Sequence, residues 1–478
     1  MVAIMNRQFV LLALLATTAC APMPRLGEVA PPRDVASLAA QQSLTGPAAA
    51  WPSDEWWKGL GDPALDALIT EGLNGSPDVV AAAARVRAAE ALSQQARAAI
   101  GPSLAVDGSV GGTQQSQNLG PPPQFVPDGV LDTGRLTAML SFNPDLWGKN
   151  RAALRAARGE AAAALVDAAQ ARLLLTTSIA AAYADLALYY IQRDVALDAV
   201  KVREQIAKLT ADRVSVGLDN RGSMAQAETR LPQARADVLA IDEAMVLTRN
   251  RIAALLGAGP DRGLSIARPA LKPVPLGIPS DASIALVGRR PDIVAAKLRA
   301  EAASARVKVA RADFYPNVNL SVLAGVQSLG VGRLLTSNSG YGNGGLAVSL
   351  PVFDAGRVQG RYRGARADYD AAVARYDGTL VAALRDVADA LATRNAADIR
   401  LAQLNAALVS AEEGSRIALL RYRGGLSNEL SVLATADGLL AVRRAAADLD
   451  ARRTALDIIL IRALGGGYRS TPIDAGAK

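Results

Sequence analysis

Apolar residues alternate with small or polar residues in four short stretches of the chain, and this period of two is typical of β-strands. The four stretches are 104–111, 135–142, 318–327 and 345–350. Each would have one apolar face and one small or polar face. A loop rich in Gly, Pro, Ser and Asn joins the members of each pair, at 111–130 and 328–344. The pattern therefore predicts two pairs of strands in a chain that is otherwise helical.

The helical pattern is unusually long. No Pro occurs between about Trp147 and Val216, and small or apolar residues recur there at alternating spacings of three and four, as in a coiled-coil seam. About 70 residues at 1.5 Å each give a helix of roughly 105 Å. We also expect an Ala-rich helix at about 77–100, before the first strand pair. A return helix at about 223–256 is expected to follow a reversal at Gly217.

The chain contains this plan twice. Pro77-Asp78-Val79-Val80 recurs as Pro291-Asp292-Ile293-Val294, an offset of 214 residues. Arg213-x-x-x-Gly217-Leu218 recurs as Arg421-x-x-x-Gly425-Leu426, an offset of 208. A register kept through Pro and Gly landmarks indicates a tandem repeat. The second copy predicts helices at about 291–313 and 430–463.

Composition excludes several classes of function. Among 478 residues there is no His and one Cys, so neither a His-based catalytic pair nor an imidazole or thiolate metal site can form. We expect no enzyme, no metal and no cofactor; an enzyme built on carboxylates alone is disfavoured because no pattern indicates a pocket. The net charge of +7 comes from dispersed Arg residues without interleaved aromatics, which favours solvated helix faces over nucleic-acid binding. No stretch approaches the roughly 18 to 20 apolar residues of a membrane-spanning helix.

The N-terminus has the parts of an export signal. Arg7 precedes the apolar run 9–16, and small residues then lead to Cys20. This resembles a bacterial lipoprotein signal, in which Cys20 would carry the lipid, including palmitate; an ordinary secretory signal is the alternative. We therefore divide the chain into a signal peptide (1–19), a lipidated tether (20–60), a first repeat (61–270), a second repeat (271–467) and a C-terminal tail (468–478).

If the apolar face of these strands contacts lipid in an exported chain, an open sheet would leave its edge N–H and C=O groups unsatisfied there. The sheet must therefore close with further copies of itself. Two copies would give eight strands and a barrel filled by its side chains, whereas three would give twelve and leave a lumen. We expect a homotrimer. Trp147, where strand leads into helix, is placed to lie at a membrane interface.

Several motifs, taken in order, resemble the TolC-like outer-membrane efflux channels, in particular the lipoprotein (NodT-like) branch that serves resistance-nodulation-division pumps. They include Trp56-Trp57, Asp145-Leu146-Trp147-Gly148, Arg289-Arg290-Pro291-Asp292-Ile293, Tyr315-Pro316 and Tyr422-x-x-Gly425, and the similarity runs from about Cys20 to Gly467. The resemblance implies a mixed, mainly α fold: a trimeric β-barrel in the outer membrane, with four strands per protomer, continuous with a periplasmic α-helical barrel. It further implies a passive exit duct for small molecules such as antibiotics, docked through a periplasmic adaptor onto an inner-membrane pump.

The two helix turns are the candidate functional sites, because in the family they form the tip that meets the adaptor. The candidate contact residues are Arg213, Val216, Gly217, Leu218 and Ser223, with Arg421, Gly424, Gly425, Leu426 and Ser427. A tight reversal alone explains the glycines. Related channels are often closed by a ring of Asp after the second turn, but this chain has Ser431 and Ala434 there. Glu429 and Asp437 are the remaining gate candidates, and a solvated helix carboxylate is the simpler explanation of each.

Other functions stay open at this point. A duct of a type I protein secretion system or of a metal-cation exporter would use the same architecture, although the absence of His disfavours a metal-selective lumen. A lipid-anchored periplasmic adaptor would also have long helical hairpins. The repeated strand pairs argue against the adaptor.

Overall fold

The computed structural model describes residues 23–28, 31–116, 118, 122–272 and 277–470, so Cys20 lies outside the described residues. The chain forms two compact units, and each draws on both halves of the sequence. The first unit comprises Arg87–Ala163 and Lys297–Arg375 together with the segment before Arg33. The second unit comprises Arg33–Val86, Ala164–Ala296 and the chain from Tyr376 onward.

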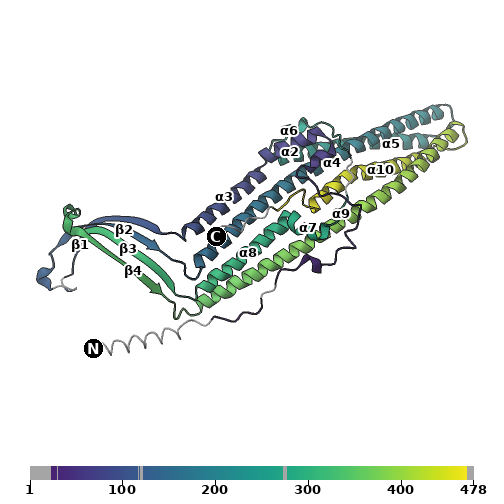
Figure 1. Cartoon of the computed structure of the whole chain (residues 1–478). Helices are drawn as coiled ribbons and strands as arrows, with labels where there is room; N and C mark the ends of the chain where they lie inside the picture. Colours follow the sequence, from purple (N-terminus) through teal and green to yellow (C-terminus); the bar gives the residue numbers. More distant parts are fainter. Residues whose placement is uncertain (1–22, 29–30, 117, 119–121, 273–276, 471–478) are drawn as a thin grey trace. The chain divides into compact units, whose positions relative to one another are not determined.

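The first unit contains one four-stranded antiparallel sheet in the order β1-β2-β3-β4 (Figure 1). Its strands are β1 (Ser103–Gln114), β2 (Val130–Phe142), β3 (Asn317–Leu329) and β4 (Gly340–Ser349). All four expected strands are thus confirmed, each somewhat longer than the alternating stretch that predicted it. Within the described residues β1 and β4 each pair on one side only, so both edges are open.

The register places most of the large apolar residues of the four strands on one face, although Met139 and Leu323 pair on the other. Leu104 pairs with Leu140, and Leu140 in turn pairs with Val322, while Leu320 pairs with Leu346. Directly paired residues point to the same side of a sheet, so these side chains form one continuous apolar surface. The other face carries rows such as Ser103, Ser141, Ser321 and Gly345. Most of the apolar face is exposed in the single chain, with Leu104 70% and Leu346 64% accessible.

The helices repeat with equal lengths in the two halves. In the first half they are α3 (Pro77–Ala98, 22 residues), α4 (Lys149–Ser215, 67 residues) and α5 (Arg221–Leu255, 35 residues). The second half has α8 (Pro291–Ala312), α9 (Arg357–Arg423) and α10 (Glu429–Ala463), also of 22, 67 and 35 residues. The expected helices and the tandem repeat are confirmed. Shorter helices are α2 (Pro63–Gly75), α6 (Asp261–Leu264) and α7 (Ala282–Arg289).

The second unit has the larger apolar core. Trp56 and Trp57 are buried in it and pack with Ile179 and Tyr183 of α4. The Tyr183 hydroxyl donates a hydrogen bond to Asp62 Oδ2 at 2.9 Å, which satisfies a phenol that is fully buried. This cluster fixes the middle of α4 against the segment before α2.

One described helix, α4, is long and apolar enough to cross a membrane by length and composition, where the sequence suggested none. Half of its most apolar window is buried inside the structure. A helix in the core of a water-soluble body passes the same test. The packing of α4 against Trp57 and its neighbours gives its apolar residues an ordinary structural reason.

Candidate functional site at the two helix turns

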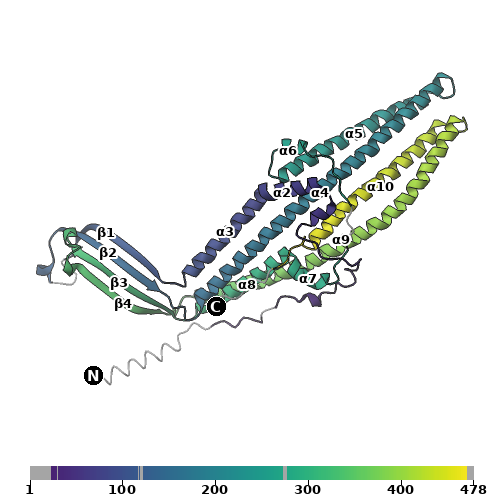
Figure 2. The same cartoon turned by 45° about the horizontal axis from the view of Figure 1, so that its top comes forward.

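Both hairpins of the second unit reverse through the same backbone structure (Figure 2). Gly217 and Gly425 have φ of 77° and 73°, the left-handed region. The Leu218 amide donates to the Arg213 carbonyl and the Leu426 amide to the Arg421 carbonyl, both at 2.8 Å. These bonds are typical of a helix C-terminus closed by glycine. A Cβ added at either glycine would meet nothing within 4 Å, so backbone conformation alone requires glycine there.

Each return helix begins with an asparagine cap. The Asn220 side chain accepts a hydrogen bond from the Ser223 amide at 3.0 Å, and Asn428 accepts one from the Ser431 amide at 3.2 Å. Ser431 therefore lies in the capped first turn of α10. Neither cap is among the candidates predicted from the sequence, although Asn at the start of a helix is a recognised signal.

A polar cluster joins the two hairpins at their turns. Arg213 Nε donates to Asp219 Oδ2 at 2.8 Å, and the Tyr422 hydroxyl donates to the same oxygen at 2.7 Å. The Arg213 guanidinium also lies 4.3 Å above the Tyr422 ring and donates to the Tyr422 carbonyl at 3.3 Å. Tyr422 is fully buried. The first hairpin therefore supplies both charged residues, Arg213 and Asp219, and the second supplies the Tyr422 side chain that contacts both of them.

The pKa values follow from these contacts. Burial opposes ionisation of Asp219, but the hydrogen bonds from Tyr422 and Arg213 outweigh it and hold the pKa of Asp219 below its ordinary value. Burial, together with the bond to Asp219, raises the pKa of Tyr422 to about 12. At neutral pH the carboxylate is therefore charged and the phenol neutral, as the donor and acceptor roles require.

The two gate candidates lie in different surroundings. Glu429 is only 2% exposed and accepts a hydrogen bond from the Thr210 hydroxyl at 3.1 Å, so it forms a second link between the hairpins. Burial raises the pKa of Glu429. Asp437 is half-buried and forms ion pairs with Arg203 and with Arg230, the latter at 3.0 Å. Neither carboxylate is the free, solvated helix residue that the simpler explanation assumed.

The other predicted contact residues divide into an apolar and a polar set. Val216, Leu218 and Leu426 are exposed at 67%, 63% and 72%, so each turn presents apolar side chains to the surroundings. Arg421 is exposed and makes no ion pair with any residue that the structure describes, in contrast to Arg213. Ser427 has a buried hydroxyl without a hydrogen-bond partner in the described structure.

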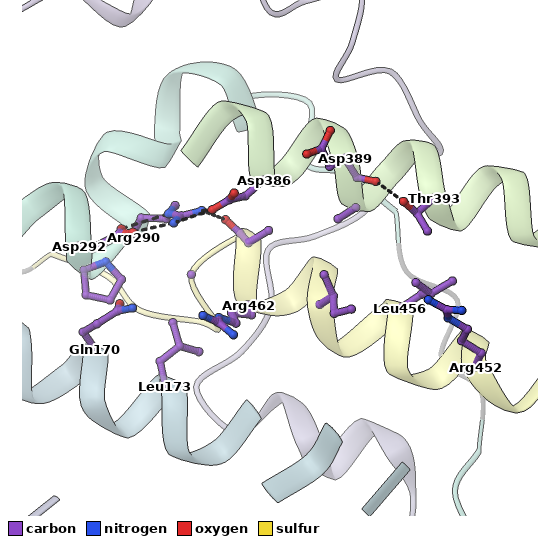
Figure 3. Close-up of a pocket in the computed structure, with 15 residues that line it drawn as sticks. Gln170, Leu173, Arg290, Asp292, Asp386, Asp389, Thr393, Arg452, Leu456 and Arg462 are labelled. Atoms are coloured by element: carbon purple, nitrogen blue, oxygen red, sulfur yellow. Dashed lines mark hydrogen bonds and ion pairs between the residues drawn. The ribbon is translucent and has the colours of Figure 1, made fainter. Parts of the chain in front are cut away.

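A separate cavity of about 540 Å³ lies in the second unit between α4, α9, α10 and the start of α8 (Figure 3). Arg290 spans one end of it: the guanidinium donates to Asp292, at 2.6 Å, and to the Ala463 carbonyl, at 3.1 Å, and pairs with Asp386. These bonds hold the first turn of α8 to the end of α10. In the described part of the chain no cluster of acidic, His or Cys side chains could hold a metal ion. The arrangement around Arg290 is structural.

Comparisons with known proteins identify related chains. A family model described as outer membrane efflux protein matches residues 68–258 and 284–466. The fusaric acid resistance protein FusA of Burkholderia cepacia is 36% identical over 327 residues, which cover 67% of this chain and 61% of FusA. The multidrug resistance outer membrane protein MdtP of Escherichia coli K12 is 32% identical over 88% of each chain. The crystal structure of the outer membrane protein VceC from Vibrio cholerae covers 87% of this chain and all of that chain, at 40% identity and a TM-score of 0.84.

Proposed function

Because the chain belongs to the outer membrane efflux protein family, we propose that it is the outer-membrane channel of a tripartite efflux pump, a passive exit duct for small molecules such as antibiotics. The observation that carries the proposal is the four-stranded sheet with one continuous apolar face and two open edges. In lipid both edges must find partners. Further copies of the same sheet supply them.

Three copies are the smallest assembly that encloses a lumen. Each sheet has four strands, so three sheets close into a barrel of twelve, wider than the eight-stranded barrels that side chains fill. The apolar face then contacts lipid and the face with Ser103, Ser141 and Ser321 lines the water-filled interior. The long helices of the three chains continue as a helical barrel into the periplasm. Such a duct performs no covalent chemistry, because the pump supplies the energy.

We propose that the exposed side chains of the two turns contact the periplasmic adaptor, which connects the duct to an inner-membrane pump. Val216, Leu218 and Leu426 offer apolar contacts, and Arg421 offers a charge without a partner in the described structure. Small exposed apolar groups beside a free cation suit a docking surface. Glu429 and Asp437, both on α10, are retained as gate candidates.

The lipid anchor at Cys20 belongs to this proposal as well. Lipidation would fix the N-terminus to the membrane that holds the barrel. We expect Cys20→Ser to abolish incorporation of labelled palmitate while leaving trimer formation intact. Undiminished labelling would show that the signal is an ordinary secretory one.

The proposed function is tested in a strain that lacks this protein. Expression of the full chain should restore resistance to several unrelated antibiotics, and the purified protein should behave as a trimer by light scattering in detergent. Restored secretion of a protein, or restored export of a metal cation without drug resistance, would favour the corresponding alternative duct. A monomer that complements nothing would contradict the proposal.

A further inference from the structure

A basic pocket of about 510 Å³ lies in the first unit, where β2 leads into α4 and α8 leads into β3. The side chains that matter in it are Trp147, Arg151, Arg155, Lys308, Arg311 and Tyr315. Four of these six carry a positive charge, and no carboxylate lines the pocket. A cavity with four cations and no acid is suited to an anion.

Three of the four cations have no partner among the residues that the structure describes. Arg151 donates to the carboxylate of Asp145 at 3.2 Å and to its carbonyl at 3.0 Å. Arg155, Lys308 and Arg311 are exposed and form no ion pair or side-chain hydrogen bond with any described residue. Arg311 has an independent structural reason, since a cation in the last turn of α8 is favourable at a helix C-terminus. Arg155 and Lys308 do not lie at a helix end and have no such structural reason for their charge.

A second set of cations at the same junction provides an internal comparison. Lys149 pairs with Asp313 at 2.6 Å, and Arg361 approaches the same carboxylate at 3.9 Å. Asp313 thus neutralises these cations within the chain. Arg155, Lys308 and Arg311 in the pocket have no such carboxylate partner among the described residues, so their charge is available to a ligand.

Two stacked aromatic rings form the wall of the pocket. Trp147 and Tyr315 lie 4.8 Å apart with nearly parallel planes, and the Trp147 indole N–H donates to the Pro316 carbonyl at 2.7 Å. Trp147 nevertheless stays half exposed. Indole and phenol rings with one apolar and one polar end favour the boundary between lipid tails and water. The ends of β2 and β3, from which the apolar face of the sheet extends, are only a few residues away.

We propose that this pocket binds the phosphate of an anionic phospholipid in the membrane leaflet at the helical end of the sheet. The inference rests on the proposed function, because it requires the sheet to span a membrane. Arg155, Lys308 and Arg311 contact the phosphate, the Trp147–Tyr315 pair packs against the glycerol region, and the acyl chains follow the apolar face of the strands. Basic side chains at a membrane surface attract anionic lipids in this way.

The experiment uses the full-length protein in detergent, with Trp51→Phe in every sample because Trp51 is only partly buried. The fluorescence that responds is then that of Trp147, which is half exposed whereas Trp56 and Trp57 are buried. The protein is titrated with a short-chain phosphatidylglycerol, with the matching phosphatidylcholine and with inorganic phosphate. The test variant is Arg155→Gln with Lys308→Gln. The control is Arg158→Gln with Lys297→Gln, which removes the same charge from exposed positions of the same two helices outside the pocket.

We expect phosphatidylglycerol to bind wild type and the control alike, and the pocket variant about tenfold more weakly. Phosphatidylcholine and inorganic phosphate should bind wild type at least about tenfold more weakly than phosphatidylglycerol. Equal weakening in both variants would overturn the inference in favour of general surface charge. Inorganic phosphate that binds as tightly as the lipid would overturn it in favour of a free-anion site. Channel conductance of the same samples is measured separately. A protein that conducts but shows no lipid preference refutes this inference alone. A protein that does not conduct refutes the proposed function.

Discussion

The two helix turns share one backbone but differ in chemistry. At an offset of 208 residues, Gly425 repeats Gly217 and Asn428 repeats Asn220, with the same φ and the same cap. The acidic and the aromatic residue of the cluster are not repeated: Ser427 stands where the first turn has Asp219, and Tyr422 stands where the first half has Val214. The repeat preserves the glycine and the asparagine cap that the chain reversal requires. The residues that link the two hairpins differ between the turns: Arg213 and Asp219 come from the first hairpin and Tyr422 from the second.

Arg213 and Arg421 show how far the repeat can mislead. They recur in register before each glycine, which suggested one shared role. In the structure Arg213 is bonded to Asp219 and stacked on Tyr422, whereas Arg421 is exposed without an ion partner among the described residues. The first holds the hairpins together, and the second is available to another protein.

The largest effect is expected from Asp219→Ala. The change removes the acceptor of both Arg213 and Tyr422 and leaves a fully buried phenol without its partner, at a cost of about 2 kcal/mol to local stability. Hydrogen exchange at the amides of both turns should accelerate, whereas Asp212→Ala, at an exposed position on α4, should change nothing. Unchanged exchange at the second turn would show that the cluster does not join the hairpins.

A smaller effect is expected from Gly217→Val. A β-branched residue at φ of 77° is strained by about 1 to 2 kcal/mol, although the site has room for it. We expect the trimer to form normally while antibiotic resistance falls, because the first turn loses its shape. Val at Gly259, which has open space around it and an ordinary φ, is the control. Normal adaptor cross-linking together with normal resistance would contradict a role for this turn in docking.

The pH dependence of the link should come mainly from Glu429, because the lowered pKa of Asp219 keeps that carboxylate charged to pH values below its ordinary titration range. Burial raises the pKa of Glu429 above 4.5, so the docked state binds a proton more readily than the separated one. The link between the hairpins should therefore strengthen as pH falls through the raised pKa of Glu429 toward 4.5. The charged and titratable groups around this site are Asp219, Arg213 and Tyr422. Glu429→Gln should abolish this dependence in exchange measured between pH 7 and pH 4.5; a dependence that persists would assign it to another group.

The smallest effect on the fold is expected from Arg421→Ala. No described contact is lost, so thermal unfolding and channel conductance should match wild type within error. Binding to the adaptor should weaken, as measured by cross-linking in membranes. A loss of stability comparable to that of Asp219→Ala would show that the two arginines have the same role after all.

Local rules made most of the fold predictable from sequence. Period-two alternation located β1 to β4, and the absence of Pro located α4, because both patterns depend on neighbouring residues alone. The site was harder. Tyr422 meets Asp219 across 203 residues of sequence, and no spacing rule predicts which hairpin faces which. Glu429 was assigned as a solvated or gating carboxylate for the same reason, since its burial against Thr210 depends on the docking of the two hairpins.

Single-channel conductance in planar lipid bilayers tests the central claim, a trimeric duct whose hairpin tips are held together by the Arg213–Asp219–Tyr422 cluster. We expect purified wild-type protein to form channels of low conductance, and Asp219→Ala to form channels of the same ion selectivity and clearly higher conductance. If both wild-type protein and the Asp219→Ala variant insert into the bilayer but conduct no current, the proposal of a duct is contradicted. Equal conductance of the two proteins would contradict the role of the cluster.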